Sequence, residues 1–158
     1  MKITLLNLAR YNQWANKILV NLVQTQAPEL LEKEIDSSFN TLKKTILHIA
    51  DAEYIWHCRL TNVPFDKIPS KIGAGIEALE VQDQKIIAFI ESKEDAYFAE
   101  HTEYKTLKGD SFTNMNFSIL THLFNHGTFH RGQIVTMLRN GGFKGHIEST
   151  DFISFERL

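Results

Sequence analysis

Apolar residues return every three or four positions in four separate stretches of the chain, the spacing of the buried face of an α-helix. The first stretch covers residues 5–22 and ends near Pro28, which disfavours a continuing helix. The second opens in the cap-rich segment DSSFNTL and runs through residues 42–60 until NVPF stops it. These two stretches predict two long helices in the first part of the chain.

The third and fourth stretches lie further along. The third follows GAG and covers residues 76–90, and the fourth runs from about Asn116 to a pair of glycines that suits a left-handed helix cap. Four helices of roughly twenty residues each make an antiparallel four-helix bundle the most economical architecture. We therefore expect an all-α fold.

Two segments lie outside the predicted helices. Residues 97–118 alternate loosely in polarity and turn at KGD, so we expect a long connection containing a short, poorly paired hairpin. The tail, residues 143–158, keeps large apolar side chains and is expected to pack back on the helices. No repeat or linker divides the chain, so residues 1–158 are expected to form a single domain.

Composition narrows the range of functions. The 158 residues include 17 basic and 19 acidic ones, with no basic run that would follow a phosphate backbone, so nucleic acid is not an expected partner. The opening MKITLLNLAR is too short in its apolar part for a signal peptide or a membrane span, which favours a cytoplasmic protein without membrane association. The single cysteine, Cys58, cannot form an internal disulfide and is expected to pack as a small buried thiol.

The most distinctive motif is THLFNHGTFHRGQ, residues 121–133, in which His122, His126 and His130 recur every fourth residue. Residues four apart on a helix differ by about 40° in direction and about 6 Å along the axis, so two such imidazoles can share one ion. Residues eight apart are separated by about 12 Å along the axis, too far to converge on an ion. At most one adjacent pair of these histidines can therefore bind the same ion.

The helical phase favours one pair. Relative to the apolar stripe, His126 and His130 lie near its centre and His122 lies about 100° away, near its edge. The alternative interpretation is that His126 and His130 are two unrelated histidines that bind no ion. An imidazole without a partner inside an apolar stripe costs free energy, which favours a site over chance.

Two known metal motifs are excluded. A zinc protease needs a glutamate directly after the first histidine, and that position is Gly127. A carboxylate-bridged di-iron bundle needs Glu-x-x-His, whereas Glu53 and His57 are one residue too far apart. A third ligand must come from another helix, and periodicity leaves its identity open: His48 lies on the flank of its apolar arc, and His57 points roughly 180° away from it. We expect the two remaining histidines, His101 and His146, at the surface.

Other polar and aromatic residues have structural interpretations. Glu53 and Asp83 fall on inward stripes and are expected to make buried hydrogen bonds, with Asn12 or an arginine as partner. Arg131 lies about 80° off the stripe and is expected at the surface or in an inter-helix ion pair. Three aromatic residues are expected to fill the core or line a pocket: Trp14, Trp56 and Phe129.

Three segments, RYNQWAN, ILHIADAEYIW and HLFNHGTFHRGQI, in this order and at this spacing, resemble the DinB/YfiT-like superfamily of metalloenzymes. The resemblance covers most of the chain and implies a four-helix bundle with up-down-down-up connectivity, often dimeric. It also implies a divalent ion held by His48, His126 and His130. His122 matches a histidine outside the ligand set and becomes a candidate for lining the cavity, as do Glu53 and Asn12.

Three neutral imidazoles leave an open position on zinc or nickel, which suits catalysis. Relatives in the superfamily use a low-molecular-weight thiol, so the resemblance implies a metal-dependent transferase that adds such a thiol to a small electrophilic substrate. A metal-dependent hydrolase and a non-enzymatic, stress-response metal-binding bundle stay as alternatives, and a bundle without metal ranks last. No residue of the motif declares itself as a general base.

Overall fold

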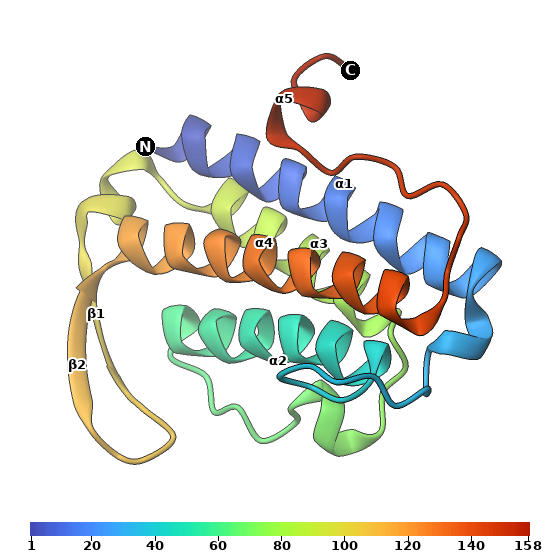
Figure 1. Cartoon of the computed structure of the whole chain (residues 1–158). Coiled ribbons are helices and arrows are strands. Elements are labelled where there is room, and N and C mark those ends of the chain that lie inside the picture. The colour runs from blue at the N-terminus through green and yellow to red at the C-terminus, as the bar shows by residue number, and fades with distance from the viewer.

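Four long helices form the body of the protein in a computed structural model that describes residues 1–158. Figure 1 shows them side by side, with α1 and α4 in front of α3 and α2 beneath α4. Each of α1 and α2 packs against both α3 and α4. The helices are α1 (Lys2–Gln26), α2 (Leu42–Thr61), α3 (Ala78–Ser92) and α4 (Asn116–Gly141).

The ends of these helices follow the local sequence signals. The Thr41 hydroxyl accepts a hydrogen bond from the Lys44 amide and caps the start of α2. At the other end of α2, Asn62 adopts a left-handed conformation with φ 54°. Gly142 ends α4 with φ 104°, a value that favours glycine. All four predicted helices are therefore present, with ends close to the expected ones.

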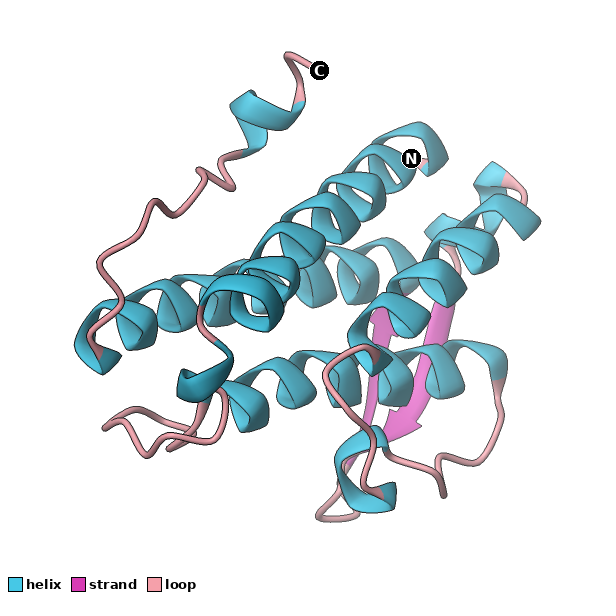
Figure 2. Cartoon of the chain, turned by 90° about the vertical axis from the view of Figure 1, so that its right-hand side faces the viewer, coloured by secondary structure: helices cyan, strands magenta, loops and turns pink.

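A small antiparallel sheet is the clearest departure from a purely helical fold. Strands β1 (His101–Lys105) and β2 (Ser111–Met115) pair from His101 with Met115 to Lys105 with Ser111. The expected hairpin is thus present, but it is paired at every position, because Thr106 and Gly109 close its turn with backbone hydrogen bonds. The two strands lie at one end of the helices in Figure 1 and behind them in Figure 2.

The core consists of two apolar clusters with a polar layer between them. One cluster of 15 buried residues includes Leu22 and Met137, and the other, of 11, includes Leu5 and Leu123. Along every long helix, buried polar residues separate the part that joins one cluster from the part that joins the other. Five residues of this layer form a polar cluster: Asn12, Asn16, Glu53, Asp83 and Arg131.

The tail returns along α1, as Figures 1 and 2 show, and ends in the short helix α5 (Phe152–Phe155). The Tyr11 hydroxyl donates a hydrogen bond to the Thr150 carbonyl, and the Tyr11 ring meets Phe152 edge to face at 5.1 Å. This confirms the expected packing of the tail. Cys58 is a buried free thiol, also as expected. None of the helices is long and apolar enough to cross a membrane.

Candidate metal centre

Three histidine side chains meet between α2 and α4. His48 Nε2 lies 3.0 Å from His126 Nε2, which lies 3.1 Å from His130 Nε2. One ligand atom from each residue can be chosen so that all lie within 4.8 Å of one another. Nitrogen atoms bound at about 2.1 Å to a tetrahedral ion lie roughly 3.4 Å apart. The three nitrogens are thus placed to hold one divalent metal ion.

Local and tertiary structure contribute differently to this group. His126 and His130 are one turn apart on α4, so the helix itself brings them together, as the phase predicts. His48 joins them only because α2 packs against α4. The structure therefore brings together the three residues that the resemblance names.

The other histidines lie outside the group. The ring of His122 is 6.0 Å from that of His126 and 5.9 Å from that of Trp56, and it lines a neighbouring pocket of about 290 Å³. His57 packs edge to face on Phe89 of α3. His101 and His146 are exposed, as expected.

Gln133 and the segment before α2 orient two of the three imidazoles. His130 Nδ1 lies 2.7 Å from Gln133 Oε1, and we assign the proton to Nδ1, which leaves the Nε2 lone pair facing the other histidines. The Gln133 amide in turn donates to Ser38 Oγ. Phe39 stacks on the His48 ring at 4.3 Å between centroids. The sequence analysis missed these supports, although Gln133 lies three residues after His130 on the same face.

All three imidazoles are held neutral. Burial and the neighbouring histidines, His130 first, lower the pKa of His126 to about 4. Burial, followed by the charge of His130, lowers the pKa of His48 despite an opposing effect of Asp51. Burial also lowers the pKa of His130. Neutral imidazole is the form that binds metal, and a set of three nitrogens suits zinc or nickel. The residues present therefore fit a divalent ion.

Glu53 and Asn12 belong to the buried polar cluster rather than to the histidine group. Asn12 Nδ2 donates to Glu53 Oε1 at 2.8 Å and to Asp83 Oδ1 at 2.9 Å. Arg131 Nη1 donates to the amide oxygens of Asn12 and Asn16 at 2.6 and 2.9 Å. These contacts confirm the structural roles expected for Glu53 and Asp83, with Asn12 as their partner.

One sequence-based expectation is wrong. Arg131 is only 2% exposed, and its guanidinium binds amide oxygens of α1 instead of lying at the surface. Phe129 is 64% exposed, which excludes the core from the two roles expected for it, and its ring meets the His130 ring edge to face beside the histidine group. Trp14 contacts Phe155 of the tail, and Trp56 lines the pocket beside His122, as expected.

Gly127 has a packing role. A Cβ at this position would lie 2.7 Å from Asn12 Oδ1, so only glycine lets α4 approach α1 over the polar cluster without displacing Asn12. The residue that excludes a zinc-protease motif therefore also permits the contact between Asn12 and Arg131.

The carboxyl groups of the cluster hold protons at unusually high pH. Burial raises the pKa of Asp83 from 3.8 to about 7, although Asn16, Arg131 and Asn12 oppose the shift. Burial and the nearby Asp83 raise the pKa of Glu53 well above its ordinary value. One positive charge, on Arg131, thus faces two carboxyl groups that resist full ionisation.

This arrangement predicts how stability depends on pH. Because the folded-state pKa of Asp83 is raised, its contribution is complete below about pH 4 and is lost as pH rises through about 7. The loss is on the order of 2 to 4 kcal/mol in the free energy of unfolding. Urea unfolding of metal-free protein at a series of pH values checks this, with Asp83→Asn as the comparison. The histidines are common to both proteins, so parallel curves would contradict the prediction.

Comparison with known proteins shows the family of the chain. The DinB family matches the chain over residues 1–157. The chain is also 25% identical over 148 residues to Protein DinB of Bacillus subtilis (strain 168), which covers 86% of this chain and 85% of that protein. Since the family match extends over nearly the whole length and includes all three clustered histidines, the chain belongs to the DinB family.

Proposed function

We propose that the protein is a divalent-metal-dependent enzyme that transfers a low-molecular-weight thiol to a small electrophilic substrate. The observation that carries the proposal is the convergence of three neutral imidazoles, from His48, His126 and His130, on one point. A divalent ion with three such ligands keeps an open position, at which it lowers the pKa of a thiol or of water and polarises a substrate oxygen.

The residues of the chain have distinct parts in this proposal. The three histidines hold the ion, and Gln133 fixes the orientation of His130. The pocket beside His122 and Trp56 offers room for the electrophile. In the transfer, the thiol sulfur bonds to the electrophilic carbon, the leaving group departs with the bonding electron pair, and the thiol proton passes to solvent.

A thiol is favoured over water as the nucleophile because a thiolate sulfur is intrinsically the more reactive of the two toward an electrophilic carbon. The ion would lower the pKa of either nucleophile, so neither depends on a general base, and the three clustered imidazoles, held as ligands, supply none. The hydrolase is therefore the second candidate.

The proposal also covers the order in which the helices are connected and the number of chains in the assembly. Helices α1 and α4 run from the 11-residue apolar cluster to the 15-residue one, and α2 and α3 run the opposite way. This order supports the up-down-down-up connectivity of the resemblance. A homodimer acting on a small molecule, without nucleic acid, completes the proposal.

The test compares metal-loaded with metal-free protein. Protein loaded with Zn²⁺ or Ni²⁺ is expected to transfer a thiol, from a panel of small thiols and electrophiles, at least about 100-fold faster than metal-free protein. The exposed His101→Ala is the matched control and is expected to keep this rate. Equal rates with and without metal would end the proposal. Product formed without added thiol would assign a hydrolase instead.

Removal of the metal ion by a chelator distinguishes the non-enzymatic alternative from the enzyme proposal. A structural ion contributes folding free energy, so its removal lowers the melting temperature sharply. The enzyme proposal expects a small change in melting temperature together with loss of activity. A large drop in melting temperature and no activity under any condition would favour a structural, stress-related metal site.

A further inference from the structure

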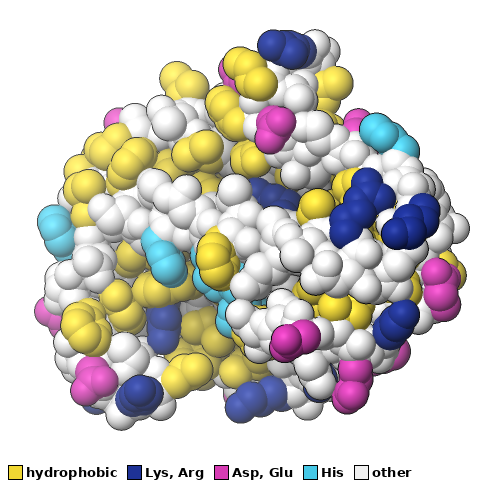
Figure 3. All heavy atoms as spheres, in the orientation of Figure 1, with side chains coloured by type: hydrophobic (Ala, Val, Ile, Leu, Met, Phe, Trp, Pro, Cys, Tyr) yellow, Lys and Arg dark blue, Asp and Glu magenta, His cyan; other side chains and the backbone are white.

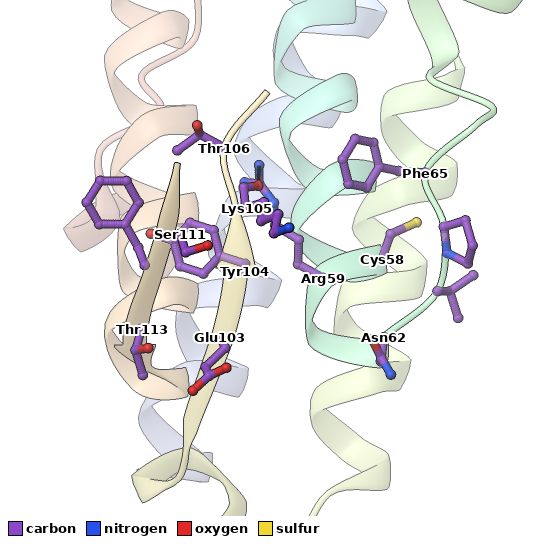
Figure 4. Close-up of a pocket in the computed structure, with 13 residues that line it drawn as sticks. Cys58, Arg59, Asn62, Phe65, Glu103, Tyr104, Lys105, Thr106, Ser111 and Thr113 are labelled. Carbon is purple, nitrogen blue, oxygen red and sulfur yellow. Dashed lines mark hydrogen bonds between the residues drawn. The ribbon is translucent and has the colours of Figure 1, made fainter. Parts of the chain in front are cut away.

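A large pocket lies apart from the three histidines. It has a volume of about 870 Å³ and is bounded by the end of α2, the loop that follows it and the hairpin. Figure 4 shows Arg59 reaching from α2 toward β1, with Tyr104 on one side and Phe65 on the other. Nothing in the metal-centre chemistry accounts for this pocket.

Arg59 is a cation without a counter-ion. Its guanidinium carbon lies 4.4 Å from the centre of the Trp56 ring, 5.0 Å from that of Tyr104 and 5.7 Å from that of Phe65. Nη2 donates to the Lys105 carbonyl at 2.9 Å, whereas Nε is buried and has no hydrogen-bond partner. None of the ion pairs of the chain includes Arg59.

This environment is costly for a lone positive charge. Burial lowers the pKa of the Arg59 guanidinium, which means that water stabilises the charge less than usual. Aromatic faces offset part of that cost but supply no hydrogen-bond acceptor. A half-buried cation with an unfilled donor is stabilised by an anion placed against it.

The other charges of the pocket favour an anion too. Lys105 also lines the pocket, and Glu103 is the only acidic residue among the lining side chains. Figure 4 shows Glu103 pointing away from Arg59. The pocket therefore presents a net positive charge beside three aromatic rings, those of Phe65, Tyr104 and Phe112.

We propose that this pocket binds a small organic anion, in which a carboxylate or phosphate group pairs with Arg59 and a planar apolar body packs on Tyr104 and Phe65. The site does not require a metal ion, and it stands independently of the proposed function.

A chain of side-chain contacts connects the pocket with the metal centre. Trp56 contacts both Arg59 and His122, whose ring lies 6.0 Å from that of His126. Along α2, Arg59 lies 11 residues after His48, a distance of about 16 Å. Figure 3 shows the hollow between α2 and α4, in which histidine, hydrophobic and basic side chains are exposed together. A ligand bound at Arg59 is thus linked to the histidine group through Trp56 and His122.

Calorimetric titration tests the site with benzoate, phenyl phosphate and the neutral benzamide, on metal-free and zinc-loaded protein. Benzoate or phenyl phosphate is expected to bind saturably to both forms, at least about tenfold more tightly than benzamide. The anion that binds more tightly identifies the group that the pocket recognises. Arg59→Met, which keeps the apolar stem, is expected to weaken this binding about tenfold or more. Arg10→Met, which removes an exposed guanidinium from α1, is the matched control and is expected to bind like the unmodified protein.

Several results would overturn the proposal. These are absence of anion binding, equal affinity for benzamide, or unchanged affinity in Arg59→Met. The Arg59 Nε–H resonance in NMR spectra of the unmodified protein gives a readout that needs no variant. It is expected to shift on addition of the tighter anion and not on addition of benzamide, and an unmoved resonance would refute the site even if Arg59→Met failed to fold.

Discussion

Replacing His126 with alanine is expected to remove the divalent ion from the protein. His126 is the central member of the group, because its Nε2 lies within 3.1 Å of the Nε2 atoms of both His48 and His130. Its loss leaves two imidazoles from two different helices, which hold an ion far more weakly than three. We expect a fall in zinc or nickel affinity of more than about 100-fold, since even residues that only support a ligand contribute 10- to 100-fold.

Elemental analysis of protein purified without an affinity tag measures this effect. His146→Ala, which removes an exposed histidine of the tail, is the matched control and should retain the ion. His122→Ala should retain it as well, because His122 lies one turn beyond the converging pair. An unchanged metal content in His126→Ala would remove the basis of the proposed function. Loss of the ion in His122→Ala would show that His126 and His130 are not the pair of ligands on α4.

Replacing Arg131 with methionine is expected to cause a large loss of stability. The guanidinium bonds to Asn12 and Asn16, and its charge faces Glu53 and Asp83. Without it, buried amide oxygens lose their donors and two buried carboxyl groups lose their only cation. Breaking such a buried charged network costs about 3 to 5 kcal/mol in the free energy of unfolding. For a chain of this length, that corresponds to a fall of roughly 10 °C in melting temperature.

Urea and thermal unfolding measure this loss. Arg10→Met serves as the control, since Arg10 pairs with Glu91 at the surface and its replacement should change stability by less than about 0.5 kcal/mol. The comparison is made at pH 8, above the pKa of about 7 of Asp83, so that this carboxyl group is ionised. A loss in Arg131→Met no larger than that in the control at this pH would contradict the prediction, because it would mean that the cluster needs no cation. The loss in Arg131→Met is expected to shrink at pH 4, where both carboxyl groups are protonated.

The placement of Arg131 shows where helical periodicity is insufficient. A single inward stripe accounts for only one buried face of α4, but this helix packs against both α1 and α2. Neighbouring positions on a helix differ by about 100° in direction. His126 and His130 therefore face α2, whereas Gly127 and Arg131, one residue later in each case, face α1. The Arg131 side chain, about 80° off the stripe, is thus buried against a second helix, α1.

Several features followed from the sequence alone because their causes are local. Apolar spacing predicts four helices, and Thr41 and Gly142 lie within the predicted cap segments. The convergence of His126 and His130 follows from the pitch of a single helix. The expected bonding between Glu53, Asp83 and Asn12 rests on inward phase and on the cost of burying unpaired polar groups.

Other features depend on contacts between residues distant in the sequence, and only the tertiary structure decided them. Periodicity could not choose His48 as the third histidine, which the family resemblance supplied, because its position depends on the packing of α2 against α4. The support of Gln133 by Ser38 and the burial of Arg131 against α1 depend on long-range packing in the same way. The chain alone thus determined the helices and a chelating pair. The packing of α4 against two neighbours decided which side chains complete the metal centre and which form the buried charge cluster, because one helix fixes directions only relative to its own axis.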